Sequence, residues 1–151
     1  MPIGPEMRRL RAEHDALSTL SQLLAGLIRA AEPPRPTELA SVRGMLRDTL
    51  LRHLKCEDWI LYPRLKASGN AAIVTMASEF VHEMGHIAED FAAYDARWTA
   101  ASIADDWPGF CRETEVVLNV LGMRIERENC DLYPVAEQLD FAVPGELWAD
   151  R

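Results

Sequence analysis

The segment HLKCEDWILYP, residues 53–63, recurs in altered form as RIERENCDLYP at residues 124–134. Both segments end in Leu-Tyr-Pro, and both carry a glutamate four residues before that leucine, namely Glu57 and Glu128. The first residue and the glutamate are also four positions apart, which is about one turn of an α-helix. The two segments therefore present the same side-chain pattern along a helix. They differ at the first position, which is a histidine in one segment and Arg124 in the other.

The similarity extends to the sequence that precedes the two segments. His14 precedes His53 by nearly the same interval by which His86 precedes Arg124. Such a repeat over both halves of the chain indicates a duplicated pair of helices. In a helical bundle, the matching helices of a duplicated pair place matching residues around one pseudo-symmetric centre.

Apolar residues recur at helical spacing along nearly the whole chain, and proline and glycine fall between the periodic blocks. This pattern predicts one all-α domain over residues 1–151. The expected helices cover about residues 5–31, 37–66, 71–100 and 106–138, and a tail covers residues 139–151. Short connections make successive helices antiparallel, so we expect an up-down-up-down four-helix bundle. Pro63 and Pro134 lie near matching helix ends, where each is expected to kink or end its helix.

Composition narrows the class of protein. The chain of 151 residues has a formal net charge of -8, and its acidic residues outnumber the basic ones, which argues against nucleic acid as a partner. It has no apolar run of about 20 residues, the length of a membrane span, and no export signal at its N-terminus. Its three cysteines show no Cys-x-x-Cys spacing, so they indicate neither a disulfide framework nor a thiolate metal site. We therefore expect a cytoplasmic protein without a membrane or nucleic-acid partner.

Ionisable residues interrupt the apolar stripes that should form the core. His53 and Glu57 lie on the apolar side of the second helix, Arg124 and Glu128 lie on that of the fourth, and His14 lies on that of the first. The apolar neighbours are Met7, Leu10 and Leu17 on the first helix; Leu39, Val42, Leu46, Leu50, Ile60 and Leu61 on the second; and Phe110, Val117, Val120, Leu121, Val135 and Leu139 on the fourth. Ionisable groups in a core are costly unless they are paired or bind a metal. Three helices that carry them at matching heights need one common explanation.

A metal site provides that explanation. Residues four apart on a helix point in one direction, so a helix can offer a metal two ligands through His53 and Glu57, or through His82 and His86. Imidazole and bridging carboxylate groups suit iron or manganese, and four-helix bundles hold such sites between facing helices. A single buried histidine is more often a hydrogen-bonded core residue. The chain has only four histidines, however, and all four fall at positions that this arrangement would use.

The order of these motifs resembles the hemerythrin-like (HHE cation-binding) domain. The chain has a histidine on the first helix, HLKCE followed by LYP on the second, HEMGH on the third, and a glutamate followed by LYP on the fourth. The resemblance implies a four-helix bundle with a non-heme di-iron centre, in which manganese or zinc could substitute for iron. It implies binding or sensing of a small ligand more than catalysis. The metal ligands that it implies are His14, His53, Glu57, His82 and/or His86, and Glu128.

Arg124 departs from the family pattern, which has a histidine at this position. A guanidinium group stays protonated and has no lone pair to donate, so Arg124 cannot replace an imidazole as a ligand. Three outcomes follow: an iron ion with one more open or water-filled position, a mononuclear site, or no metal. In the last two outcomes, the positive charge of Arg124 could occupy the place of the second metal and balance Glu57 and Glu128.

The third helix gives a conflicting signal. Its large apolar residues lie almost opposite His82 and His86, and both faces cannot point to one core. The apolar residues of this stripe are Ile73, Met76, Phe80, Met84, Ile87, Phe91, Tyr94 and Trp98. Either the histidines face the metal and the stripe meets a partner subunit or the tail segment LDFAVPGELW, or the helix is rotated and only one histidine reaches the centre. Small residues on the histidine side favour the first alternative, so we expect a homodimer through the stripe.

Three functions are consistent with these residues. The first is a non-heme iron protein that binds or senses dioxygen or a related small ligand, such as nitric oxide or peroxide, at an open coordination position. The second is a protein that consumes peroxide or donates iron to damaged iron clusters. The third is a bundle that has lost its metal and serves protein interaction, with Arg124 in a buried ion-pair network. No phosphate-binding loop or G-x-S-x-G motif indicates another class of enzyme.

Overall fold

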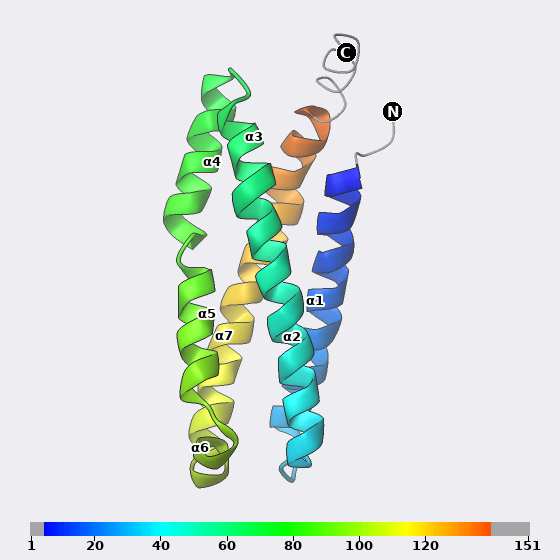
Figure 1. Cartoon of the computed structure of the whole chain (residues 1–151), viewed down its shortest axis with the longest axis vertical. Coiled ribbons are helices and arrows are strands. Elements are labelled where there is room, and N and C mark those ends of the chain that lie inside the picture. The colour runs from blue at the N-terminus through cyan, green and yellow to red at the C-terminus, as the bar shows by residue number, and fades with distance from the viewer. Residues whose placement is uncertain (1–4, 140–151) are drawn as a thin grey trace.

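The chain forms four helical rods, as the computed structural model shows for residues 5–139, the part of the chain that the structure describes (Figure 1). A short helix, α6 (Ala100–Asp105), lies between the third rod and the fourth. The rods are, in chain order, α1 (Pro5–Arg29); α2 (Pro36–Cys56) with the π-helical turn η1 (Glu57–Leu61) and α3 (Tyr62–Lys66); α4 (Ala71–Met84) with α5 (Ile87–Arg97); and α7 (Trp107–Arg127) with the π-helical turn η2 (Glu128–Leu132) and helical residues 133–139.

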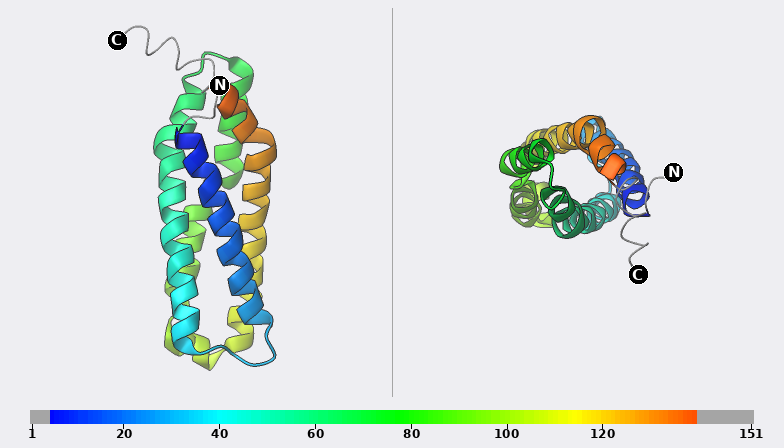
Figure 2. Two further views of the ribbon diagram at one scale, coloured as in Figure 1. Left: turned by 90° about the vertical axis from the view of Figure 1, so that its right-hand side faces the viewer. Right: turned by 90° about the horizontal axis from the view of Figure 1, so that it is seen from above.

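Successive rods run in opposite directions around a common axis, as Figure 1 and Figure 2 show. α1 packs against both α2 and α7, so the first rod lies between the second and the fourth. Residues 5–139 contain no strand, and the predicted all-α bundle is confirmed. Within the same residues, no helix combines the length and the apolar character that crossing a membrane requires.

Local signals fix where the helices begin. The side-chain oxygens of Asn70, Thr99 and Asp106 each accept a hydrogen bond from a backbone N–H in the first turn of α4, α6 and α7, respectively. These contacts satisfy donors that have no partner inside the helix. Gly69, just before α4, has a φ of 77°, a conformation that a residue without Cβ adopts at little cost. The helices α4, α6 and α7 therefore each begin at a capping side chain.

A belt of buried polar residues divides the core into two apolar clusters. Along α1, Leu10 belongs to one cluster, His14 to the belt and Leu17 to the other cluster. The second and fourth rods show the same change from one cluster to the other at the level of the belt. We call this group the polar belt, and its members are His14, His53, Glu57, Arg124 and Glu128. The core is thus interrupted where the sequence places ionisable residues on three helices.

The third rod is oriented opposite to the prediction. Its large apolar side chains, including Phe80, Phe91 and Tyr94, are buried in the core. His82 and His86 are exposed instead. The physical reason is the hydrophobic effect, because burial of each large apolar side chain stabilises the fold by about 1.5–3 kcal/mol and the stripe contains several of them. The prediction that both histidines face the metal is therefore wrong.

The same orientation turns toward the core the stripe on which the predicted homodimer depends. The most deeply buried residues of the stripe contact the chain's own helices, and Ile73, Met76 and Trp98 pack partly buried against the two clusters. The stripe is therefore buried or partly buried within the chain itself, and the homodimer stays a prediction. The other proposed occupant, the tail segment LDFAVPGELW, lies outside the described residues after its first residue, Leu139.

The helix expected over residues 71–100 is interrupted at Gly85 and His86. α4 ends at Met84, and α5 begins at Ile87. At this break the Gly85 N–H donates to the Val81 carbonyl oxygen at 2.7 Å, and a Cβ on Gly85 would overlap that oxygen. The close approach requires a glycine.

We expect Gly85→Ala to destabilise the chain, although alanine normally favours a helix. The added Cβ would collide with backbone rather than with a flexible side chain, so α4 would have to shift. The free energy of unfolding in urea should fall by about 1–3 kcal/mol. The control is Gly122→Ala in α7, where nothing lies within 4 Å of the added Cβ and helix propensity should stabilise the chain by about 0.5–1 kcal/mol. Effects of the same sign at both positions would contradict the close approach at Gly85.

Candidate metal centre

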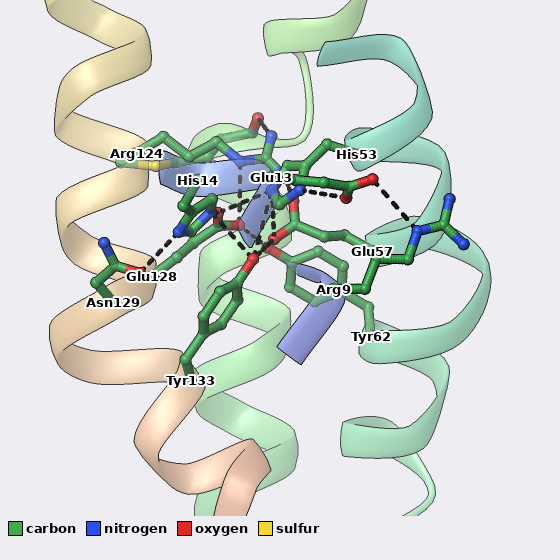
Figure 3. A network of polar contacts seen from close by, with 11 residues as sticks. Arg9, Glu13, His14, His53, Glu57, Tyr62, Arg124, Glu128, Asn129 and Tyr133 are labelled. Carbon is green, nitrogen blue, oxygen red and sulfur yellow. Dashed lines mark hydrogen bonds and ion pairs between the residues drawn. The ribbon is translucent and has the colours of Figure 1, made fainter. Parts of the chain in front are cut away.

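Four of the predicted ligands meet in the polar belt (Figure 3). His14 comes from α1, His53 from α2, Glu57 from η1 and Glu128 from η2. One nitrogen or oxygen atom from each residue lies within 4.8 Å of the corresponding atoms of the others, and all four residues are buried. Three rods therefore contribute to one group of donor atoms.

Each histidine ring is oriented by a hydrogen bond at Nδ1, the ring nitrogen that faces away from the group of donor atoms. His14 Nδ1 lies 2.7 Å from Asn129 Oδ1, and His53 Nδ1 lies 3.0 Å from Glu13 Oε1. Both oxygens are acceptors, so each Nδ1 carries a proton and donates it. The other ring nitrogen, Nε2, faces the interior of the group, where it can bind a metal once it has lost any proton. Hydrogen bonds of this kind orient histidine ligands in metal proteins.

The two glutamates each direct one oxygen to one side of the site and one to the other. On the first side, Glu57 Oε2 lies 3.3 Å from His53 Nε2, and Glu128 Oε1 lies 2.9 Å from His14 Nε2. On the second side, Glu57 Oε1 accepts a hydrogen bond from Arg124 Nη2 at 3.0 Å, and Glu128 Oε2 accepts one from Arg124 Nε at 3.2 Å. We call these the histidine side and the arginine side. The carboxylates thus bridge a possible metal position and a fixed cation.

Arg124 is held on the arginine side by contacts from three rods. Besides the two glutamates, the carbonyl of Met84 at the end of α4 accepts a hydrogen bond from Arg124 Nη1 at 2.9 Å. Burial by itself lowers the pKa of Arg124, but the charges of Glu128 and Glu57 outweigh it and raise that pKa above its ordinary value. The guanidinium therefore stays charged. A metal ion placed on the same side would be repelled at short range in a medium of low dielectric constant.

The two π-helical turns aim a tyrosine at the site together with each glutamate. The N–H of Tyr62 donates to the carbonyl of Glu57, and the N–H of Tyr133 donates to the carbonyl of Glu128, in each case five residues back. In an α-helix the hydrogen bond spans four residues, so the fifth residue after a glutamate points well away from it. A π-helical turn spans five residues and brings that fifth residue back toward the same face.

The two tyrosine hydroxyls lie on different sides of the site. Tyr133 Oη donates to Glu57 Oε2 at 2.7 Å and lies 3.0 Å from His14 Nε2, so it belongs to the histidine side. Tyr62 Oη donates to Glu128 Oε2 at 3.1 Å, which places it on the arginine side. Matching positions in the two halves of the chain therefore have different surroundings.

Sequence analysis misses four residues of the site: Glu13, Tyr62, Asn129 and Tyr133. The repeated Leu-Tyr-Pro motif could have identified the two tyrosines as site residues, but α-helical spacing places them away from the glutamates. Pro63 and Pro134 were expected to kink or end their helices. Neither ends its helix, because helical structure continues past both, and a π-helical turn ends two residues before each proline. No periodic pattern marks Glu13 or Asn129, which are the sequence neighbours of His14 and Glu128.

When no metal is bound, the charge of the histidine side depends on the protonation of its side chains. Burial lowers the pKa of His53, but hydrogen bonds and charges from Glu128 and Glu57 outweigh it and raise that pKa to about 10. Burial raises the pKa of Glu128, but hydrogen bonds from the histidines and the Arg124 charge hold it below its ordinary value. His53 is therefore an imidazolium ion at neutral pH. A metal ion must displace its Nε2 proton in order to bind.

The spacing of the donor atoms fits one metal ion on the histidine side. Nitrogen and oxygen ligands lie about 2.0–2.2 Å from a transition-metal ion, which places neighbouring ligand atoms roughly 3 Å apart. The separations of 2.9 and 3.3 Å within the two histidine–glutamate pairs agree with this value, and His53 Nε2 lies 3.8 Å from Glu128 Oε1. Two imidazoles with carboxylates and no thiolate suit iron or manganese. The residues present therefore fit a metal.

Two of the predicted ligands do not join this group. His82, in α4, is exposed, and the His86 side chain is 58% exposed and lies 3.6 Å from Asp90. From the third rod, only the Met84 carbonyl reaches the polar belt through a recorded hydrogen bond, and it contacts Arg124. The structure therefore does not bring His82 and His86 to this group, and the predicted residues that it does bring together are His14, His53, Glu57 and Glu128.

Comparison with known proteins agrees with this architecture. The hemerythrin HHE cation binding domain matches residues 6–136, a span that includes every member of the polar belt. Comparisons with curated proteins and with solved structures gave no match. Because the match spans most of the chain and the buried histidines and glutamates form one donor group, the chain belongs to the hemerythrin HHE cation-binding domain family.

Proposed function

We propose that the chain binds one non-heme iron ion on the histidine side and that this iron binds dioxygen or a related small ligand, such as nitric oxide or peroxide. The observation that carries the proposal is the position of Arg124 between Glu57 Oε1 and Glu128 Oε2. These are the oxygens that two bridging carboxylates would present to a second metal ion. A guanidinium group holds that place, which favours a mononuclear site.

The charges of the polar belt support a single ion. Two carboxylates and one guanidinium together carry one net negative charge, so one divalent ion leaves a net charge of only about +1. A second divalent ion beside Arg124 would leave several positive charges without partners in the core, which is costly. Manganese meets the same requirements of charge and ligand type and could substitute for iron.

The surroundings of the site support the binding of a small ligand. Iron accepts up to about six ligands, so two histidines and two glutamates leave a position for a small molecule, which bound iron would polarise as a Lewis acid. The apolar clusters on both sides of the polar belt exclude bulk water from it. The chain therefore supplies fixed donors in dry surroundings.

The proposal is tested by counting iron. We expect the protein, loaded anaerobically with ferrous iron and freed of excess metal, to retain one iron per chain and to give an electron paramagnetic resonance signal with nitric oxide. His53→Ala should lose most of the iron, whereas His82→Ala with His86→Ala should retain it. Two irons per chain in the native protein would contradict the mononuclear site, and much less than one would contradict iron binding.

Iron should also stabilise the fold. A ligand that binds only the native state stabilises it by about 2.7 kcal/mol at a free concentration 100 times its dissociation constant. We therefore expect a higher thermal midpoint after anaerobic addition of ferrous iron, and no change for His53→Ala. An unchanged midpoint in the native protein would instead favour the bundle that has lost its metal, with Arg124 in an ion-pair network.

A cytoplasmic location is part of the same proposal. All three cysteines are free thiols, namely Cys56, which is buried, Cys111 and Cys130. Free cysteines and ferrous iron both persist best in a reducing compartment.

A further inference from the structure

Tyr133 has its hydroxyl among the donor atoms of the histidine side. Its Oη lies 2.7 Å from Glu57 Oε2, 3.0 Å from His14 Nε2 and 3.4 Å from His53 Nε2. These separations match those between the four acidic and imidazole donors themselves. An ion that binds both histidines and Glu57 would therefore lie next to this oxygen.

The Tyr133 side chain is held in this position by packing. It is fully buried, its ring stacks on His14 with centroids 4.6 Å apart and an interplanar angle of 11°, and the Arg11 guanidinium lies 5.5 Å from the ring centre. The π-helical turn η2 fixes the backbone just before it. Little side-chain freedom would be lost when the hydroxyl meets an ion.

Tyr62 provides the contrast within the same molecule. It occupies the matching position after η1, but its recorded hydroxyl contact is with Glu128 Oε2, which Arg124 also contacts. Its hydroxyl thus faces the fixed cation. Only one tyrosine of the repeated pair lies where a metal ion fits.

We propose that Tyr133 is the fifth protein ligand of the metal, through Oη. This inference rests on the proposed function, because it needs a metal ion on the histidine side. When the bond forms, the Oη–H bond breaks, an oxygen electron pair binds the ion and the proton is released to solvent, with no change in oxidation state. A phenolate oxygen is a hard anionic ligand, so Tyr133 would stabilise the ferric state once the bound ferrous ion has been oxidised.

Visible spectroscopy tests this ligand directly. We would load the full chain with iron, oxidise it, and record its iron content, visible absorption and resonance Raman spectrum. We expect an intense visible charge-transfer band with enhanced tyrosine ring vibrations. Tyr133→Phe should lose the band and keep most of its iron, because four other ligands remain.

The chain offers internal controls, because it has only three tyrosines: Tyr62, Tyr94 and Tyr133. Tyr94 bonds to Thr114 at 2.6 Å, away from the metal position. Tyr62→Phe and Tyr94→Phe should both keep the band, and if Tyr133→Phe does not fold, these two results assign the band to Tyr133 by elimination.

The outcomes separate this inference from the proposed function. A native protein that holds one iron per chain without the band, a band that survives in Tyr133→Phe, or one that disappears in Tyr62→Phe would overturn the ligand and leave the iron site in place. A native protein that binds no iron would overturn both.

Discussion

Replacement of Arg124 with leucine is expected to lower the free energy of unfolding of the metal-free chain by about 3–5 kcal/mol. Arg124 donates hydrogen bonds to Glu57, Glu128 and the Met84 carbonyl. Without it, two buried carboxylates would lose their permanent cation, and a charge left unpaired in the core costs far more than one at the surface. Urea unfolding in the presence of a chelator measures the loss.

The matched control is Arg127→Leu on the same helix. Arg127 pairs with Glu83 at the surface, where its side chain is 41% exposed. Surface substitutions of this kind usually change stability by less than about 0.5 kcal/mol. Equal losses for the two variants would contradict the role of Arg124 as a buried counter-charge.

Arg124→His extends the same test to metal binding. The imidazole would no longer neutralise Glu57 Oε1 and Glu128 Oε2, and it could itself act as a ligand, as a histidine does at this position in the family pattern. We expect iron binding to rise from one ion toward two per chain. A stoichiometry that stays at one would show that something other than Arg124 excludes the second ion.

The stability of the metal-free chain is expected to fall as pH rises from about 6.5 to about 10. His53 has a pKa of about 10 in the folded chain, against an ordinary value of 6.5. Between these values only the folded chain holds the proton, so the contribution of His53 is complete below about pH 6.5 and is lost toward pH 10. The loss amounts to a few kcal/mol and at most about 5 kcal/mol.

Metal affinity should change in the opposite direction over the same range. The His53 proton must leave before Nε2 can bind a metal, so the affinity should rise with pH by up to about tenfold per unit for each proton released. Urea unfolding with chelator and metal titration, each at several pH values, measure the two trends. His53→Gln should reduce both slopes, whereas His86→Gln should change neither, because His86 is exposed. A metal-free stability that rises with pH would contradict the assignment.

The sequence predicts the bundle well because its signals are repeated many times. Helical periodicity extends over every rod, and Pro33, Pro34 and Gly69 lie in connections between rods. The group of His14, His53, Glu57 and Glu128 is predictable for a related reason. An ionisable side chain in an apolar stripe has few ways to be accommodated, so its position in the sequence already indicates a shared buried site.

The remaining parts depend on local departures from the α-helix. The extra residue in each π-helical turn rotates Tyr62 and Tyr133 toward the glutamates, and helical spacing alone cannot reveal it. On the third rod, the HEMGH motif and the apolar stripe compete for the core. Several large apolar side chains outweigh two histidines in that competition, so His82 and His86 lie outside.

The third rod contributes no side chain to the polar belt, and this has a consequence for access. The Met84 carbonyl of this rod accepts a hydrogen bond from Arg124 of the belt. Other polar contacts of the rod lie away from the belt, such as those of Asp95 with Arg43 and Arg47. Metal ligation would join α1, the second rod and the fourth rod at one level and leave α4 and α5 without such a tie. With a metal ion on the histidine side, local opening of the third rod would therefore admit a small molecule to it while His14, His53, Glu57 and Glu128 stay in place.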